Sequence, residues 1–273
     1  MRGWVLIATV LVVAGCGGEA DDDEDSAGAS GEMILATTTS TVDSGLLDTL
    51  LPAYEKTSDC SVKALGLGSG EALELGSQGN ADVLLSHSPE AEKEFMAAGD
   101  GSRRDPVMHN DFVVVGPSND PADIVESASA ADALARIADS ASTFVSRADE
   151  SGTNAKELDL WAEAGVTPGG DWYEETGQGM GETLTITSQL QGYTLTDRGT
   201  YLATEGLDLE VLTQGSKDLL NFYHVIVVDH AGTNQACAEE FADWLLNPET
   251  QQLIGTFGVE EFGRQLFVPD ATD

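Results

Sequence analysis

The stretch MILATTTSTVDSGLLDTLLPAY, residues 33–54, decides the fold class. It opens with the apolar run 33–36, continues through a polar segment at 37–44, and then repeats leucines at helical spacing as far as Tyr54. An apolar run, a polar turn and an amphipathic stretch are typical of a strand followed by a helix that packs on its sheet. We therefore expect a β-strand that leads through a hydroxyl-rich turn into an α-helix.

The same alternation continues to the end of the chain, with no internal repeat. Short apolar runs predict strands at 62–67, 81–85, 111–116, 143–147, 193–196 and 224–229. Amphipathic stretches predict helices from 71, at 89–98, within 121–140, from 151, at 181–190 and over 237–257, with Asn247-Pro248 separating two helices. This pattern predicts an α/β fold, and 273 residues suffice for two lobes of ordinary domain size.

The N-terminus carries an export signal. Arg2 precedes a short apolar run, 4–15, that is too short to span a bilayer as a helix. The run ends in Val-Ala-Gly before Cys16, which resembles a bacterial lipobox. We predict that 1–15 is a signal peptide and that Cys16 becomes the lipidated first residue of the mature protein. A plain signal peptide with an incidental cysteine is the alternative.

Residues 16–32 are predicted to form an acidic, disordered tether. This segment is rich in Asp, Glu, Ser and Gly and holds no large apolar residue, so it buries too little surface to offset its ordering entropy. A run of acidic residues can in principle bind a metal. A solvated spacer fits better, because nothing in the segment fixes a coordination geometry.

The charge of the chain limits its partners. The formal net charge is −36, with 12 Lys and Arg against 48 Asp and Glu, so we expect no nucleic-acid partner. An acidic, lysine-poor, exported protein suggests a salt-rich habitat in which the repulsion is screened. Besides Cys16 there are only Cys60 and Cys237, and no Cys/His cluster has metal-ligand spacing. In an oxidising compartment these two cysteines form a disulfide or remain two buried thiols.

Three strand-to-helix junctions share one chemistry. Hydroxyl-rich segments at 37–41, 69–70 and 146–153 each precede a predicted helix, and the last contains Arg147. Hydroxyls and free backbone N–H groups at a helix N-terminus bind anions, and these junctions lie at the carboxyl ends of strands. Taken singly, each junction is better explained as a helix cap, and Arg147 can also be explained as a surface ion pair with Asp149 or Glu150. The three junctions together favour an anion site. In an anion site those two carboxylates have to be paired or turned away.

The sequence contains no complete set of catalytic residues at a recognised spacing. Ser69 is not flanked by glycines two positions away on either side, no Walker lysine follows the glycines, and the four histidines are scattered. His109-Asn110-Asp111 reads better as a hinge or turn than as an acid–base pair. We expect no enzymatic activity and no cofactor, and an exported hydrolase is the alternative from a different class.

Several segments together resemble the tungstate-binding proteins of ABC transporters (the TupA type), over about 33–268. The resemblance implies a type II solute-binding fold with two α/β lobes, each a mixed sheet flanked by helices, joined by two hinge strands. Lobe one would comprise 33–110 with 224–273, and lobe two 111–223. The segments that carry it are LATTTSTVDSGLLDTLLPAYEK (35–56), ADVLLSHSPEAEKEF (81–95), VMHNDFVVVGPSNDPA (107–122), FVSRADESGTNAKELDLWAEAG (144–165), GDWYEETGQGMGETL (170–184) and YTLTDRGTYLA (193–203).

The resemblance also implies a ligand set for one tetrahedral oxyanion. Hydroxyl donors would come from both lobes, and Arg147 would clamp the anion; the implied residues are Thr38, Thr39, Ser40, Ser69, Arg147, Ser151 and Thr153, with Gly181 and Thr196 as weaker matches. The chain departs from the family pattern at Ser69 (usually Thr), Ala148 (Gly), Asn154 (His) and Phe222 (Pro). These departures bear on selectivity rather than on the fold.

The function implied is that of a monomeric, lipid-anchored receptor outside the cytoplasmic membrane. It would capture tungstate or molybdate as cargo, with no metal cation, and deliver the anion to an ABC permease. A receptor for another tetrahedral oxyanion, such as phosphate, is the alternative within the same class. Tungstate and molybdate share charge and shape, so the sequence leaves the choice between them open.

Overall fold

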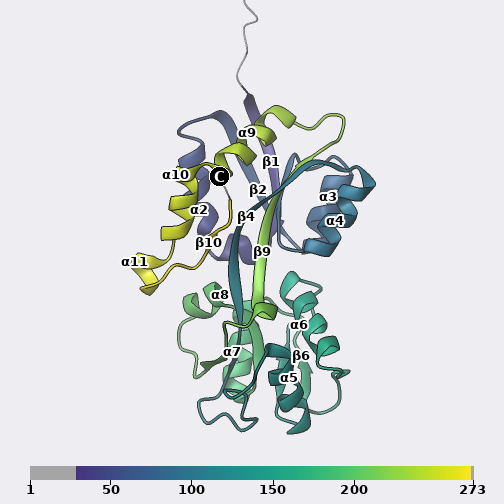
Figure 1. The fold of residues 1–273 in the computed structure, drawn as a ribbon, viewed down its shortest axis with the longest axis vertical. Helices are drawn as coiled ribbons and strands as arrows, with labels where there is room; N and C mark the ends of the chain where they lie inside the picture. The colour runs from purple at the N-terminus through teal and green to yellow at the C-terminus, as the bar shows by residue number, and fades with distance from the viewer. Residues whose placement is uncertain (1–28, 272–273) are drawn as a thin grey trace, which may run out of the picture.

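The computed structural model describes residues 29–271, which form two α/β lobes stacked end to end (Figure 1). The larger sheet has the strand order β10-β4-β9-β3-β1-β2, and β7 and β8 pair with the far half of β4. A separate small sheet pairs β5 with β6. The strands are β1 (Ser30–Thr38), β2 (Asp59–Leu67), β3 (Val83–Ser86), β4 (Gly101–Gly116), β5 (Phe144–Ser146), β6 (Tyr173–Glu175), β7 (Thr194–Asp197), β8 (Glu210–Thr213), β9 (Leu220–Val228) and β10 (Val268–Pro269).

Helices cover both faces of the sheet in lobe one, the upper lobe of Figure 1. Buried side chains alternate along the strands: Leu35 and Val225 pack in one core, while Ala36 and Ile226 pack in the core on the opposite face. The helices of this lobe are α1 (Thr39–Asp43), α2 (Leu46–Tyr54), α3 (Ser69–Ser77), α4 (Pro89–Ala98), α9 (Gln235–Leu246), α10 (Pro248–Thr256) and α11 (Val259–Phe262).

Lobe two is built from residues 112–219 and has two cores of its own. Phe112 and Val114 face one core, and the alternating residues Val113 and Val115 face the other. Its helical elements are α5 (Ala130–Asp139), α6 (Gly152–Glu163), α7 (Met180–Leu190), α8 (Arg198–Ala203) and the short 3-10 helix η1 (Lys217–Leu219).

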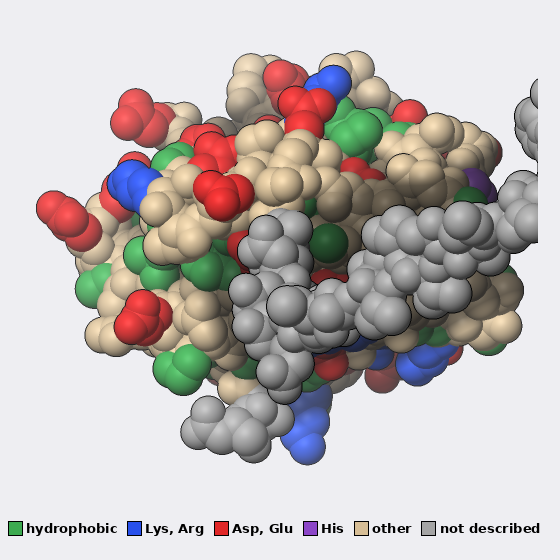
Figure 2. Space-filling view, turned by 90° about the horizontal axis from the view of Figure 1, so that it is seen from above, with side chains coloured by type: hydrophobic (Ala, Val, Ile, Leu, Met, Phe, Trp, Pro, Cys, Tyr) green, Lys and Arg blue, Asp and Glu red, His purple; other side chains and the backbone are tan. Residues whose placement is uncertain are grey.

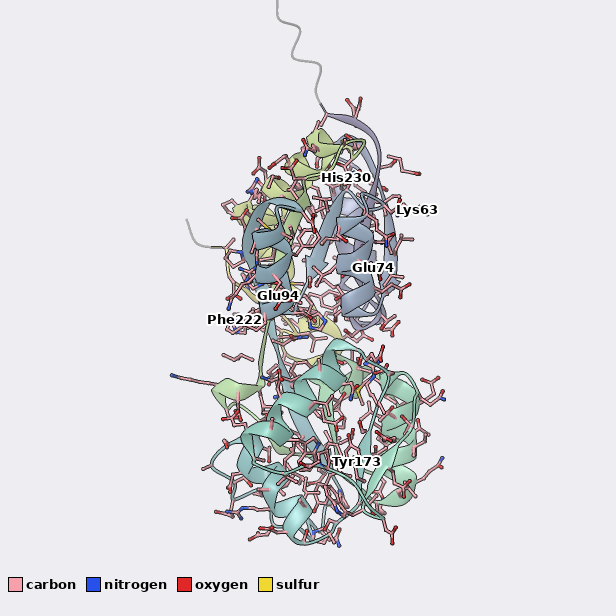
Figure 3. The ribbon with its side chains drawn as sticks, turned by 90° about the vertical axis from the view of Figure 1, so that its right-hand side faces the viewer. Lys63, Glu74, Glu94, Tyr173, Phe222 and His230 are labelled. Atoms are coloured by element: carbon pink, nitrogen blue, oxygen red, sulfur yellow. A yellow bond between two sulfur atoms is a disulfide. The ribbon has the colours of Figure 1, made fainter. Side chains whose placement is uncertain are left out.

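Two long strands join the lobes. β4 pairs with β9 as far as Asp111↔Leu220, and from Phe112 onward it pairs with β7 instead. The lobe boundaries predicted at 110/111 and 223/224 both fall inside these two continuous strands. The side view shows Phe222 of β9 at the level where the lobes meet (Figure 3).

The α/β class predicted from the sequence is confirmed, and the largest errors concern strand length. β4 begins at Gly101, ten residues before the predicted strand, because its first half pairs with β9 but is polar and lacks the apolar pattern of a strand. Arg104 in this half donates to Glu92, and Arg103 donates to Asp243. The short elements α1, β6, α8, β8, η1, α11 and β10 were not predicted.

The start of β1 corrects the predicted tether. Residues 30–32 lie in β1, paired with Asp59–Ser61 of β2, so the end of the tether segment is ordered as a strand. The side-chain amide of Asn234 donates to the carbonyl oxygens of Ser30 and Glu32, which holds this end of the strand in place. The predicted signal peptide, Cys16 and the rest of the tether lie outside the described residues.

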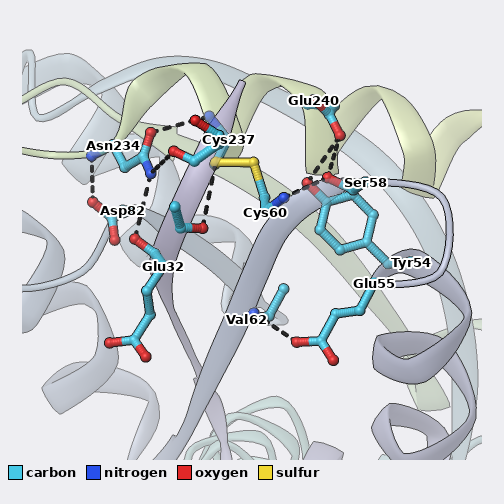
Figure 4. The surroundings of a disulfide bond; sticks show 12 residues. Glu32, Tyr54, Glu55, Ser58, Cys60, Val62, Asp82, Asn234, Cys237 and Glu240 are labelled. Atoms are coloured by element: carbon cyan, nitrogen blue, oxygen red, sulfur yellow. Dashed lines mark hydrogen bonds between the residues drawn. A yellow bond between two sulfur atoms is a disulfide. The ribbon is translucent and has the colours of Figure 1, made fainter. Parts of the chain in front are cut away.

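Cys60 and Cys237 form a disulfide next to this strand end (Figure 4). Their Cα atoms are 5.9 Å apart, and the bond joins the start of β2 to the first turn of α9. Both residues are buried. Within residues 29–271, no helix is long and apolar enough to cross a membrane.

Candidate ligand-binding site

The predicted polar turns lie at the starts of helices that face the junction between the lobes. Thr38 ends β1 and caps α1, where its Oγ1 accepts the N–H of Thr41. Ser69 is the first residue of α3, after β2. In lobe two, Ser151 caps α6 by accepting the N–H of Asn154 at 3.3 Å. Each turn therefore presents the positive end of a helix, although the caps already occupy part of its hydrogen-bonding capacity.

His87, directly after β3, brings the turns of the two lobes together. Its Nε2 lies 3.0 Å from Oγ1 of Thr38, in lobe one. A Cβ atom built on Gly152, the first residue of α6 in lobe two, would lie 2.5 Å from Cε1 of His87 and 3.0 Å from Oγ of Ser69. The lobes thus touch at Gly152, and the predicted residues Ser151 and Thr153 flank that contact.

Two buried donors of the predicted ligand set have no hydrogen-bond partner among residues 29–271. They are Oγ of Ser69, from lobe one, and Nε of Arg147, from lobe two. Buried polar atoms in folded proteins are almost always paired. Unpaired donors on both sides of an interlobe contact are suited to hydrogen-bond a ligand that supplies the missing acceptor atoms.

Arg147 is held by a carboxylate beside it. Its side chain is only 5% exposed, and Nη2 donates to Oδ2 of Asp149 at 2.6 Å. The other carboxylate oxygen of Asp149 accepts the N–H of Ser151 at 3.2 Å. The side chain of Glu150 is exposed. Asp149 is therefore paired, as an anion site at this turn requires.

A buried carboxyl group supports the turn that carries Arg147. Oε2 of Glu157 accepts the hydroxyl of Ser146 at 2.7 Å, and Oε1 accepts Trp161 Nε1–H and the Tyr173 hydroxyl at 3.0 and 2.8 Å. Burial raises the pKa of Glu157 despite these three donors.

The backbone of this turn is strained. Ala148 and Glu150 adopt φ angles of 48° and 59°, in the left-handed region that residues with a Cβ adopt at a cost. Ala148 is one of the positions where the chain departs from the family pattern, which usually has glycine there. The Ser146 hydroxyl connects this turn to Glu157. It donates to the Glu157 carboxylate and also accepts the N–H of Ala148 at 3.2 Å.

Two titratable groups that the sequence did not single out lie close to Arg147. The pKa of His87 is lowered to about 4, mainly by burial and to a smaller extent by the charge of Arg147, so the ring is neutral near pH 7. Burial raises the pKa of Asp197, which caps α8 by accepting the N–H of Thr200 at 2.8 Å, while Arg147 acts in the opposite direction. His87 directly follows the buried strand β3, and Asp197 is the last residue of the buried strand β7. Because ligands bind at the carboxyl ends of strands in α/β sheets, this position could have marked both residues as candidates.

The remaining predicted residues differ in how they are placed. Ser40 is half-buried with Oγ 3.1 Å from Oγ1 of Thr38, whereas the side chain of Thr39 is exposed. The hydroxyl of Thr196 donates to the carbonyl of Asp197 at 3.0 Å, so its proton is already used. Gly181 is the second residue of α7, and no described atom outside its own helix lies within 4 Å of a Cβ built there.

A cavity of about 400 Å³ opens beside the contact. Polar groups of Ser69, His87 and Ser151 line one part of it, and Phe112 with Phe222 contributes apolar surface. Its lining does not include Thr38 or Arg147, so the cavity is the adjoining part of the cleft rather than the space between the two unpaired donors.

Two α/β lobes joined by two strands, with unpaired buried donors in both lobes, define a bilobal solute-binding protein. A family model described as "PBP superfamily domain" matches residues 23–249. The chain is 44% identical to the tungstate-binding protein TupA of Peptoclostridium acidaminophilum, over 97% of this chain and 96% of the relative. The chain belongs to the TupA family of tungstate-binding proteins, within the PBP superfamily.

Solved structures agree with this assignment. TupA from Desulfovibrio alaskensis G20 superposes with a TM-score of 0.78 at 40% identity, covering 88% of this chain and 99% of that one. A tungstate ABC transporter protein from Geobacter sulfurreducens gives 0.74 at 45% identity, covering 83% and 98%. The predicted type II solute-binding fold is confirmed, and the chain is a solute-binding protein rather than an enzyme.

Proposed function

We propose that this protein captures tungstate or molybdate between its lobes and delivers the anion to an ABC permease. One observation carries the proposal: Oγ of Ser69 and Nε of Arg147, buried and unpaired among the described residues, come from opposite sides of the interlobe contact. The similarity to tungstate-binding relatives supports the choice of anion.

Each lobe contributes part of the proposed ligand shell. In lobe one the hydroxyls of Thr38 and Ser69 donate to the anion, while Ser40 and Thr39 complete the turn. In lobe two Arg147 supplies charge and directed N–H groups, with Ser151 and Thr153 at the start of α6. Gly181 and Thr196 remain weaker candidates, and Thr196 has to release its bond to Asp197 before it can donate.

The chemistry of such a shell explains how an acidic protein holds a dianion. A buried dianion is stable only when its oxygens are fully hydrogen-bonded, and charge-assisted bonds from a guanidinium are the strongest available. Hydroxyls and N–H groups donate to a deprotonated oxyanion but offer few acceptors to a protonated one. Donors fixed on two walls also select by size, which disfavours sulfate and phosphate.

The proposal places the protein outside the cytoplasmic membrane. Lipidation of Cys16 would anchor it to the membrane beside its permease, with the acidic segment as spacer. We infer a monomer in which the oxyanion is cargo, so that the function needs no cofactor.

Calorimetric titration tests the proposal directly. The chain from residue 17 keeps all of β1, and it would be titrated in concentrated NaCl with tungstate, molybdate, sulfate and phosphate in turn. Tight one-to-one binding of tungstate with no heat from sulfate or phosphate is expected, and the molybdate curve measures selectivity. Binding of phosphate in preference would move the protein to the phosphate-receptor alternative, and no heat from any anion would overturn the proposal.

A further inference from the structure

Gly152 is a glycine for reasons of space rather than backbone conformation. It is the first residue of α6, it is not among the glycines with positive φ, and its conformation is open to other residues. A Cβ atom there would nevertheless lie 2.5 Å from Cε1 of His87, closer than real Cβ contacts allow. The three atoms nearest to this Cβ position belong to His87 and Ser69 of lobe one, whereas Gly152 belongs to lobe two.

The group on the other side of this contact has little freedom to move. His87 is buried, its Nε2 is bonded to Thr38, and its ring packs against Tyr223 with centroids 4.8 Å apart. Tyr223 is itself buried in the hinge strand β9, where its hydroxyl accepts from Asn221 at 3.2 Å. The ring of His87 is thus a rigid surface backed by the hinge.

We propose that the contact between Gly152 and His87 is the stop that sets how far the lobes close, and hence the size of oxyanion that the site accepts. Ser69 touches the same stop from lobe one, and Ser151 and Thr153 are its immediate neighbours in lobe two. Because Ser69 of lobe one and Ser151 and Thr153 of lobe two lie at this contact, its thickness sets the span between these donors. The inference rests on the proposed function, since it assigns size selection to that same site.

The variant Gly152→Ala thickens the stop by one carbon atom. The lobes then halt short of the wild-type separation, and we expect tungstate affinity to fall about ten- to hundredfold. The melting temperature of the ligand-free protein is expected to stay the same or rise, because alanine favours a helix more than glycine does. Glu249→Ala is the control for an alanine placed in the first turn of a helix away from the contact, because Glu249 is exposed at the start of α10.

The variant His87→Ala thins the stop from the other side. Combined with Gly152→Ala it should relieve the clash, so that the alanine at 152 costs at most about twofold in affinity in the His87→Ala background. Alone, His87→Ala should raise sulfate affinity relative to tungstate, because the lobes can approach more closely.

Calorimetry on these four variants and the wild type separates the possible failures. An unchanged tungstate Kd in Gly152→Ala overturns the inference, as does a sulfate-to-tungstate ratio in His87→Ala equal to that of the wild type. If Gly152→Ala does not fold, the ratio in His87→Ala still decides. A wild-type protein that binds none of the anions would instead contradict the proposed function itself.

Discussion

Arg147 and Asp149 are joined by a hydrogen bond of 2.6 Å from Nη2 to Oδ2, in a turn where Nε of the same arginine has no partner among the described residues. The carboxylate therefore orients the guanidinium and leaves one of its directed N–H groups for a ligand. Because Asp149 balances the charge of this guanidinium, whose side chain is 5% exposed, no uncompensated buried charge is left when the ligand departs.

Arg147 should dominate the affinity for the oxyanion. We expect Arg147→Gln to weaken tungstate binding about 100-fold or more, since loss of one partner of a buried charge pair costs several kcal/mol. Arg147→Lys should recover only part of this loss, because an ammonium lacks the planar fork of a guanidinium. Calorimetry measures both variants, with Arg136→Gln on the surface of α5 as the control; wild-type affinity in Arg147→Gln would place the site elsewhere.

Acid should destabilise the protein through His87. Its pKa in the folded protein is about 4, below the ordinary 6.5, so the unfolded chain binds more protons between these values. The contribution of neutral His87 is complete above pH 6.5 and is lost as the pH falls towards 4, by ~3 kcal/mol in total.

Denaturant unfolding of wild type and His87→Gln from pH 7 to pH 4 checks this expectation. The difference in unfolding free energy between the two should shrink as the pH falls. His230→Gln, at an exposed position, serves as the control and should run parallel to wild type. A difference that stays constant with pH would show that His87 titrates at its ordinary value.

Glu157 should matter for stability first and for binding second. Glu157→Leu removes the acceptor of three buried donors, from Ser146, Trp161 and Tyr173, and should lower the unfolding free energy by about 3 kcal/mol. Affinity should fall as well, because the Arg147 turn loses its support. Urea unfolding and titration of the same sample measure the two effects; Glu163→Leu, exposed on the same helix, is the control.

The disulfide should stabilise the fold without affecting the ligand. It closes a loop with a sequence separation of 177, which corresponds to about 5 kcal/mol in the chain-entropy estimate. We expect the double variant Cys60→Ala/Cys237→Ala to melt at a markedly lower temperature and to bind tungstate with unchanged Kd, because the bond lies at the start of β2, whereas the Ser69 turn follows the other end of that strand. A changed Kd at a temperature where the variant is folded would contradict this separation.

Salt should stabilise this protein by screening its own charge. Acidic side chains stand well apart over the end face of lobe one, with few basic ones between them (Figure 2), and the net charge of the chain is −36. Raising NaCl from 0.1 to 1 M shortens the screening length from about 10 to about 3 Å, so the melting temperature should rise. A melting temperature that falls with NaCl would mean that attractive pairs, such as those of Arg103, outweigh the repulsion.

The sequence was informative wherever chemistry is local. The strand-turn-helix at 33–54 and the helix at 89–98 follow from apolar periodicity, and the same pattern located the strand-to-helix junctions that contain Thr38, Ser69 and Arg147. His87 and Gly152 escaped notice because their importance depends on two lobes meeting, which no local pattern encodes. The first half of β4 was missed for a related reason: SRRDP reads as a loop until Glu92 and Asp243, distant in sequence, supply its ion pairs.

The two crossing strands also order the events of folding. Both cores of lobe two draw only on residues 112–219 among the described residues, so one continuous stretch of chain supplies the whole of this lobe. Lobe one is not, because β3 and β4 stay unpaired on one side until β9 arrives more than a hundred residues later. Contacts so distant in sequence form slowly, so we expect lobe one to assemble on a lobe two that is already folded. The proposed anion site, which needs both lobes, would then be the last part of the molecule to form.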